Sequence, residues 1–95
     1  MEKILIGQIR SAEYMKGRTG KPRKDQMILY TDRGKVFSSY NTSIVFVSEG
    51  KTYLDYHYWN YSTTTGKYRN MFLNESGTMT KKKINAGAYI LADLN

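Results

Sequence analysis

The chain has no cysteine, and this absence excludes two kinds of structure at once. Without thiols the protein has neither a disulfide framework nor a thiolate metal site, which fits the reducing cytoplasm. Long apolar runs are lacking as well. The opening stretch 1–7 is too short for a signal peptide, and no later stretch approaches the roughly 18 apolar residues of a membrane span. We therefore expect a cytoplasmic protein without membrane contact.

Groups that carry catalysis or bind metals are also scarce. His57 is the only histidine. Strand alternation places Asp55 on the same face, which would allow an Asp55–His57 pair. A lone histidine lacks the partners that a general base or a metal site needs, and no Ser, Cys or Glu cluster supplies a third member. The eight acidic residues are scattered along the chain. The sequence predicts no enzyme, no metal and no cofactor.

Positive charge is what the chain has in excess. Fifteen Lys and Arg against eight Asp and Glu give a net charge of +7 over 95 residues, a length that fits one domain, 1–95. This balance favours a polyanionic partner such as a nucleic acid, a nucleoprotein complex or an acidic protein surface. The bland alternative is that the basic residues serve solubility alone.

The pattern of apolar residues predicts an α+β domain built on an antiparallel meander. Short connections join most of the expected strands, and Gly34 in the turn 32–35 is free to take a positive φ. The expected strands are 3–10, 26–31, 36–40, 43–48, 52–59 and 88–94. The sheet therefore has five or six strands.

One amphipathic helix, about 64–75, is expected to pack on this sheet. Tyr68, Met71 and Phe72 share a face at helical spacing, and hydroxyl residues before them offer N-caps. A further turn or two of helix is expected within 80–87. Its start carries Lys81, Lys82 and Lys83, a second basic spot that is unfavourable for the helix itself.

The stretch 11–24 follows neither period and contains the only proline, so the sequence predicts a long loop there. Extended basic residues beside Gly and Pro can follow a phosphate backbone, although a solvated loop is an equal alternative. The basic residues of the loop are Lys16, Arg18, Lys21, Arg23 and Lys24. The spacing of Gly17 and Gly20 does not match a nucleotide-binding loop, which needs four residues between its glycines.

The start of the expected helix is a second candidate site. Unpaired N–H groups at a helix N-terminus attract anions. Thr64 and Thr65, with Lys67 and Arg69 close by, are the predicted donors to a bound phosphate. The alternative is that one hydroxyl simply caps the helix. We expect replacement of Lys67 and Arg69 by alanine to weaken binding and to leave the fold intact.

Aromatic residues gather in the stretch 53–73, which holds Trp59 and five of the nine tyrosines. Such side chains can stack bases on an exposed face, as in proteins that bind single strands. A chain this short, however, must use most of its aromatic residues in the core. For Trp59 we favour a structural role.

Part of the chain resembles a group of small, uncharacterised proteins of bacteriophages and plasmids. The pattern is Ser-Tyr-Asn-Thr-x-Ile from Ser39, Tyr-Trp-x-Tyr-Ser-x-Thr-Thr-x-Lys-Tyr from Tyr58, and then Phe72-Leu73. The resemblance implies an origin in a phage or mobile element and the cytoplasm of the host cell. It implies no activity.

Two functional hypotheses follow. The first is a non-enzymatic phage accessory protein that binds nucleic acid or a nucleoprotein through phosphate contacts. The second is an inhibitor of a host defence complex, of the anti-CRISPR type, that acts by protein–protein contact. The sequence leaves open whether the partner is DNA, RNA or protein, and leaves open the oligomeric state.

Overall fold

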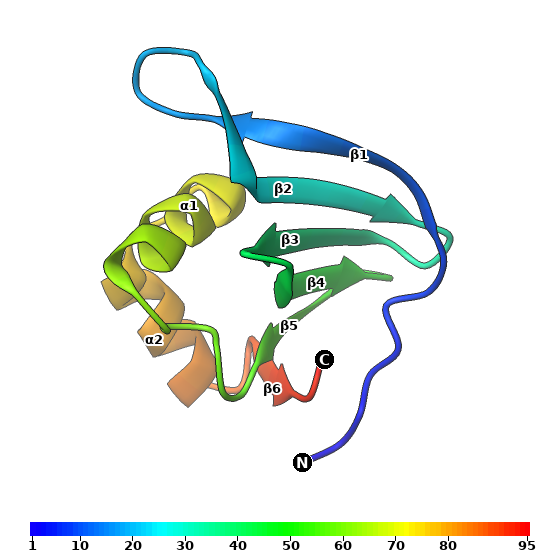
Figure 1. Ribbon diagram of the computed structural model, residues 1–95. Helices are drawn as coiled ribbons and strands as arrows, with labels where there is room; N and C mark the ends of the chain where they lie inside the picture. Colours follow the sequence, from blue (N-terminus) through cyan, green and yellow to red (C-terminus); the bar gives the residue numbers. More distant parts are fainter.

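The computed structural model describes residues 1–95 and consists of one six-stranded sheet with two helices on one of its faces (Figure 1). The strands follow one another across the sheet in chain order. They are β1 (Ile9–Lys16), β2 (Pro22–Thr31), β3 (Lys35–Ser39), β4 (Thr42–Ser48), β5 (Lys51–Asp55) and β6 (Ile90–Ala92). The α+β class and the antiparallel meander β1–β5 are confirmed, whereas β6 pairs parallel to β5 and makes the sheet mixed.

Two helices connect β5 to β6, where the sequence predicted one helix at about 64–75 and only a further turn or two within 80–87. α1 (Thr63–Leu73) ends because Asn74 takes a left-handed conformation with φ of 54°. α2 (Gly77–Asn85) then starts after Ser76, whose side chain accepts a hydrogen bond from the N–H of Met79. The expected helix 64–75 is thus shorter, and the expected turns within 80–87 are the second half of α2. Neither helix is long and apolar enough to cross a bilayer.

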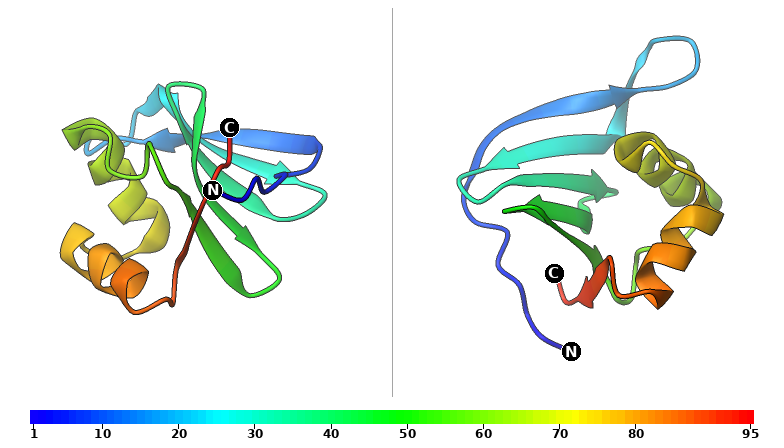
Figure 2. Two further views of the ribbon diagram at one scale, coloured as in Figure 1. Left: turned by 90° about the horizontal axis from the view of Figure 1, so that it is seen from below. Right: turned by 180° about the vertical axis from the view of Figure 1, so that it is seen from behind.

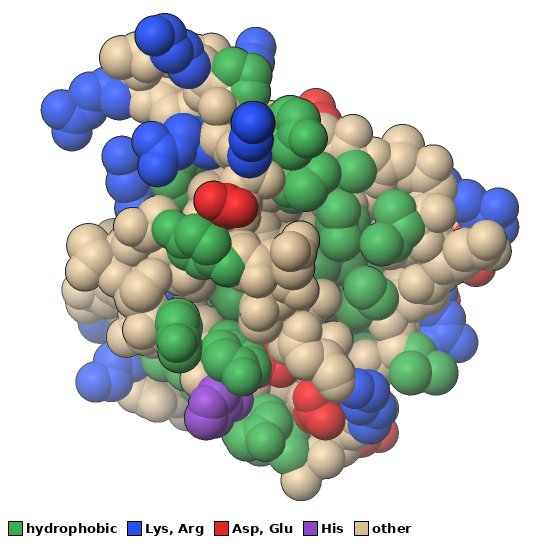
Figure 3. Space-filling view, in the orientation of Figure 1, with side chains coloured by type: hydrophobic (Ala, Val, Ile, Leu, Met, Phe, Trp, Pro, Cys, Tyr) green, Lys and Arg blue, Asp and Glu red, His purple; other side chains and the backbone are tan.

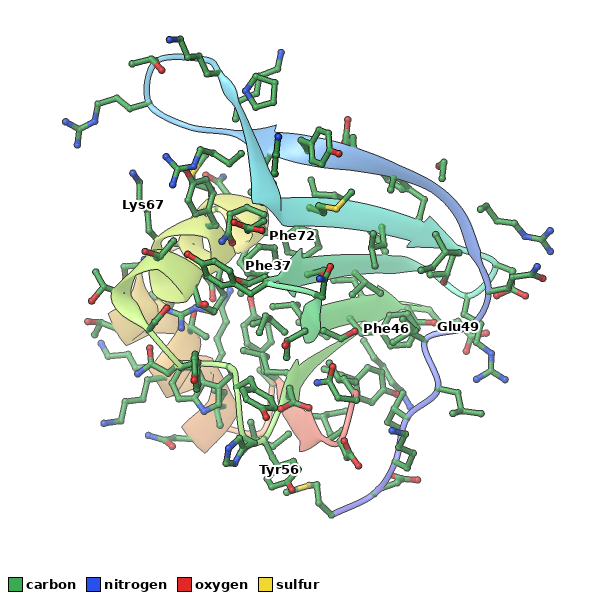
Figure 4. The ribbon with its side chains drawn as sticks, viewed as in Figure 1. Phe37, Phe46, Glu49, Tyr56, Lys67 and Phe72 are labelled. Atoms are coloured by element: carbon green, nitrogen blue, oxygen red, sulfur yellow. The ribbon has the colours of Figure 1, made fainter.

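The larger core lies between the helices and the sheet. Its buried residues include Phe37 from β3, Leu54 from β5 and Tyr68 from α1. Phe37 stacks on Phe72 of α1 with a centroid distance of 5.8 Å, and Figure 4 shows the two rings between α1 and the sheet. These contacts fix α1 over the central strands.

A smaller core covers the other face of the sheet. Buried Phe46 stacks on Tyr53 at 6.0 Å, and Ile4 and Ile6 of the N-terminal segment pack against this cluster. The sequence predicted a strand at 3–10, but residues 3–8 belong to no strand and form a single bridge, between Lys3 and Asp93. This segment runs from β1 at one edge of the sheet toward β6 and the C-terminus (Figure 2). The prediction was wrong because apolar residues cover a sheet face here without joining its ladder.

β1 and β2 form a long hairpin where the sequence predicted a loop. The loop is confined to residues 17–21, and residues on both sides of it pair antiparallel, from Tyr14 with Met27 to Lys16 with Pro22. Seven of the eight β1 residues are exposed, the exception being Met15. A strand with two exposed faces shows no apolar alternation, which explains the wrong prediction.

Two turns also differ from expectation. β5 stops at Asp55 rather than at residue 59, because the Asp55 carboxylate accepts hydrogen bonds from the backbone N–H groups of His57 and Tyr58. Gly34 does not use a positive φ. A Cβ on Gly34 would instead collide with the carbonyl oxygen of Val47, so this turn needs glycine for close approach of two backbones.

Candidate functional site

The tip of the β1–β2 hairpin presents five basic side chains on an ordered turn. The N–H of Gly17 donates to the carbonyl of Lys21 at 2.9 Å, and that of Gly20 donates to the carbonyl of Gly17 at 3.0 Å. All five basic side chains are exposed, namely Lys16, Arg18, Lys21, Arg23 and Lys24. In Figure 3 the Lys and Arg side chains gather over this tip, at the top left.

The structure brings the hairpin tip to the side of α1. A hollow of about 370 Å³ is lined by Arg18, Lys21 and Arg23 of the hairpin together with Lys67 and Tyr68 of α1. Figure 4 shows Lys67 extending from α1 toward the hairpin. The hydroxyl of buried Tyr68 would lie 3.3 Å from a Cβ at residue 17, so glycine there allows this close approach. The two stretches that the sequence singled out separately therefore share one surface.

The five basic side chains of the hairpin and Lys67 of α1 make six cations, and none of them has an acidic partner. The ion pairs in the structure join Lys3 to Asp93 at 3.9 Å and Lys83 to Glu75 at 2.7 Å, both outside the hairpin tip and α1. The four of them that line the hollow, Arg18, Lys21, Arg23 and Lys67, create a positive potential there, and Lys16 and Lys24 on the same hairpin add to it. An anion bound there would displace no internal ion pair.

The start of α1 uses its hydroxyl groups internally. Ser62 is the N-cap, and its Oγ accepts from the N–H of Thr65 at 3.1 Å. Thr65 is buried, and its hydroxyl is 3.0 Å from that of Ser39 and 3.1 Å from that of Ser62. Thr64 is half-buried. Thr65 thus joins α1 to β3 and is not free to bind an external anion.

Arg69 is also an internal residue. Its side chain is 2% exposed, and its guanidinium donates to the carbonyl of Trp59 at 2.7 Å and to the side-chain oxygens of Asn60 and Asn70 at 3.1 and 2.9 Å. Burial lowers the pKa of the guanidinium, while nearby Glu75 partly offsets this effect. The expectation that Arg69 could be replaced without harm to the fold does not fit these contacts.

Lys67 is the predicted α1 residue that remains available. It is exposed, and it also lines an open hollow of about 800 Å³ at the start of α1. The other lining residues of that hollow are Asn60, Tyr61, Ser62, Thr63, Gly66, Arg69 and Asn70. Lys67 therefore lies between the helix start and the basic hairpin.

The possible pair of Asp55 and His57 takes a different form. Asp55 is buried, and it bonds the backbone of His57 rather than the imidazole. Its other oxygen accepts from the N–H of Leu94 at 2.9 Å and from the amide of Asn95 at 3.0 Å. Asp55 thus fixes the C-terminus beside β5. No three His, Asp or Glu side chains are grouped so that they could hold a metal ion.

One group of exposed tyrosines was not among the predicted site residues. Tyr40, Tyr58 and Tyr61 line a third hollow of about 410 Å³ beside the start of α1. The sequence predicted that most aromatic residues lie in the core, with base stacking on an exposed face as the alternative. The signal that could have identified Tyr40 is its place in the two-residue turn 40–41, where the chain reverses and a side chain is exposed.

A comparison with protein-family models matches residues 10–87 to a family of unknown function (DUF8033). The chain belongs to this family. The matched part of this DUF8033 protein runs from β1 through α2. It contains the hairpin, α1 and the basic residues that line the hollow between them. No curated protein and no solved structure matches the chain.

Proposed function

We propose that this protein is a non-enzymatic nucleic-acid-binding protein that contacts phosphates between the β1–β2 hairpin and α1. One observation carries the proposal: four exposed cations from two distant stretches line one hollow, Lys16 and Lys24 lie on the same hairpin, and none of the six has an acidic partner. A phosphate backbone neutralises such a cluster and releases its own counterions, which drives binding. Arg18 and Arg23 add planar donor groups that fit phosphate oxygens.

The order of the hairpin supports the same proposal. A flexible arm would lose conformational freedom on binding, whereas a turn held by its own hydrogen bonds keeps its cations in place. Phosphate contacts of this kind carry no sequence information by themselves. We therefore expect binding with little sequence preference from the hairpin alone.

The resemblance to phage and plasmid proteins supplies the proposed setting. In that setting the protein is an accessory factor in the host cytoplasm, and its partner is a nucleic acid or a nucleoprotein complex. The structural features that support this proposal are the positive surface and its unpaired charges.

Filter binding of DNA and RNA by two charge-matched variants tests the proposal. The first variant replaces Lys21, Arg23 and Lys24 of the hairpin with glutamine. The second replaces Lys51, Lys81 and Lys82, which are exposed elsewhere on the molecule. Since both lose three positive charges, only a localised site makes them differ, and the hairpin variant should bind much more weakly.

Equal weakening by both variants would show that net charge alone attracts the polyanion. The alternative, an inhibitor of a host defence complex, has its own test by pull-down from host lysate after nuclease treatment. A protein that stays bound through the hairpin surface would favour the inhibitor, and loss of every partner would favour direct nucleic-acid binding.

A further inference from the structure

An exposed row of aromatic rings runs along one side of the molecule. The ring of Tyr61 lies 5.4 Å from that of Tyr58, Tyr58 lies 4.5 Å from His57, and His57 lies 6.0 Å from Tyr56. Tyr40 lines the same hollow as Tyr58 and Tyr61. We call these five residues the tyrosine row. Such a row of ring faces and edges is uncommon on a surface that has only solvent to contact.

The tyrosine row is more exposed than core packing requires. Tyr40 is 51% exposed, Tyr56 is 48% exposed and Tyr61 is 67% exposed. The side-chain hydroxyl groups of these three residues and of Tyr58 make no hydrogen bond within the protein, unlike those of Tyr30 and Tyr89. The rings therefore contribute little to the larger core beyond the partial packing of Tyr58.

Tyr40 adds an independent sign of function. It occupies the first position of the two-residue turn between β3 and β4 with φ of 50°, followed by Asn41 with φ of 62°. Turns of this kind favour Asn or Gly, and a bulky side chain is strained there. Tyr40 therefore does not stabilise the turn, and strained residues of this kind cluster at functional sites.

The tyrosine row begins beside the basic surface. The N–H of Tyr40 donates to the carbonyl of Asp25 at 2.8 Å, one residue beyond Lys24 of the hairpin. Tyr61 lines the same hollow as Lys67 at the start of α1. In Figure 3 hydrophobic side chains lie on the same face between the Lys and Arg side chains and the single histidine. Phosphate contacts and ring contacts are thus neighbours along one path.

We infer that the nucleic acid is single-stranded and that its bases stack on the tyrosine row while the basic surface holds its phosphates. This inference rests on the proposed function. A duplex keeps its bases stacked inside the helix and offers only phosphates and groove edges, whereas a single strand exposes base faces that aromatic side chains bind. The positive charge of the hairpin complements the phosphates of a single strand, and it disfavours an apolar partner or one with little negative charge.

Fluorescence anisotropy with labelled oligonucleotides of about 15 nucleotides tests the inference, with oligo-dT, oligo-U and a matched duplex as probes. The variants are Tyr61→Ala and Tyr40→Asn, with Tyr30→Ala as control, since Tyr30 is exposed outside the row. Asn tolerates the left-handed turn conformation, so Tyr40→Asn should fold at least as well as the wild type. Circular dichroism melts check this for every variant.

Both row variants should weaken single-strand binding by about 5-fold or more and leave duplex binding within about 2-fold, with Tyr30→Ala unchanged for both. The ratio of oligo-dT to oligo-U affinity then assigns DNA or RNA. Equal loss for single strand and duplex, or no loss in either row variant, overturns the inference while hairpin-dependent binding still supports the proposed function. Absence of any binding by the wild-type protein overturns both.

Discussion

Arg69 is a buried cation whose contacts are all to neutral groups. Its guanidinium bonds the Trp59 carbonyl and the side chains of Asn60 and Asn70, and it lies 5.3 Å from the centre of the Trp59 ring. In this position Arg69 joins α1 to the turns that follow β5. Trp59 is half-buried and packs against the larger core, in agreement with a structural role.

Arg69→Ala should therefore destabilise the fold. Three partly buried acceptors would lose their donor and a cavity would replace the buried guanidinium, so the expected loss is about 2–4 kcal/mol in the free energy of unfolding. Arg69→Lys should recover little, because an ammonium group cannot reach three acceptors in one plane. Urea denaturation, followed by circular dichroism, measures the free energy of unfolding of both variants. Wild-type stability in Arg69→Ala would instead indicate a surface role for this residue.

Glu75 makes a contribution to folding stability that depends on pH. Its side chain is 7% exposed and accepts hydrogen bonds from Thr80, Lys83 and Tyr89. Burial alone raises the pKa of Glu75, but these hydrogen bonds outweigh burial and hold its pKa below the ordinary value of 4.5. The carboxylate thus stabilises the fold above that value, and the contribution is lost as the pH falls through the folded-state pKa.

Glu75→Gln should lower the urea midpoint at neutral pH, and the gap from the wild type should narrow below about pH 4. Glu49→Gln is the control, since Glu49 is exposed in the turn after β4 and belongs to neither ion pair. A gap for Glu75→Gln that stays constant from neutral to acid pH would contradict the assignment of this carboxylate.

At the scale of elements, the turn between β2 and β3 depends on close approach of two backbones. Gly34→Ala should lower stability by more than about 2 kcal/mol, because the new Cβ would meet the Val47 carbonyl in a neighbouring strand. Gly20→Ala is the comparison: it takes φ of 80° with no atom within 4 Å of its Cβ position, so only strain of about 1 kcal/mol applies. Thermal melts of the two variants should differ clearly. Similar melting temperatures would show that β3 and β4 can separate at this turn.

The sequence predicted best those elements whose signals are local. β2 to β5 have apolar runs closed by short turns, and Ser62 and Asn74 bound α1 through groups within three or four residues. The parallel pairing of β6 with β5 depends on a crossover through both helices, which no local pattern reveals. β1 was missed because it is exposed on both faces.

The candidate site divides along the same line. Sequence identified the basic residues of the hairpin and Lys67, and the exposure of these side chains follows from their charge. Sequence could not tell that Thr65 and Arg69 point inward. A hydroxyl at a helix start can cap the helix as well as bind an anion, and a guanidinium further along can bond internal carbonyl oxygens as well as a phosphate. The approach of the hairpin to α1 is a tertiary contact and needed the structure.

At the scale of the whole molecule, the charged residues behind the net charge of +7 are unevenly distributed. One end of the molecule carries the hairpin and Lys67, while the opposite face of the sheet is covered by the N-terminal segment and includes Asp32, Arg33 and Glu49 around a hollow of about 580 Å³. Mixed charge there gives a polyanion no preference for that face. Under the proposed function, we expect the hairpin end to set the orientation on a nucleic acid.

The salt dependence of single-strand binding tests this account most directly. If the six cations each neutralise one phosphate, the plot of log Kobs against log salt between about 50 and 200 mM should have a slope of about −4 for the wild type. Replacing Lys21, Arg23 and Lys24 should reduce it to about −2. A slope near zero, or no retention of any oligonucleotide even at about 50 mM salt, would contradict the account.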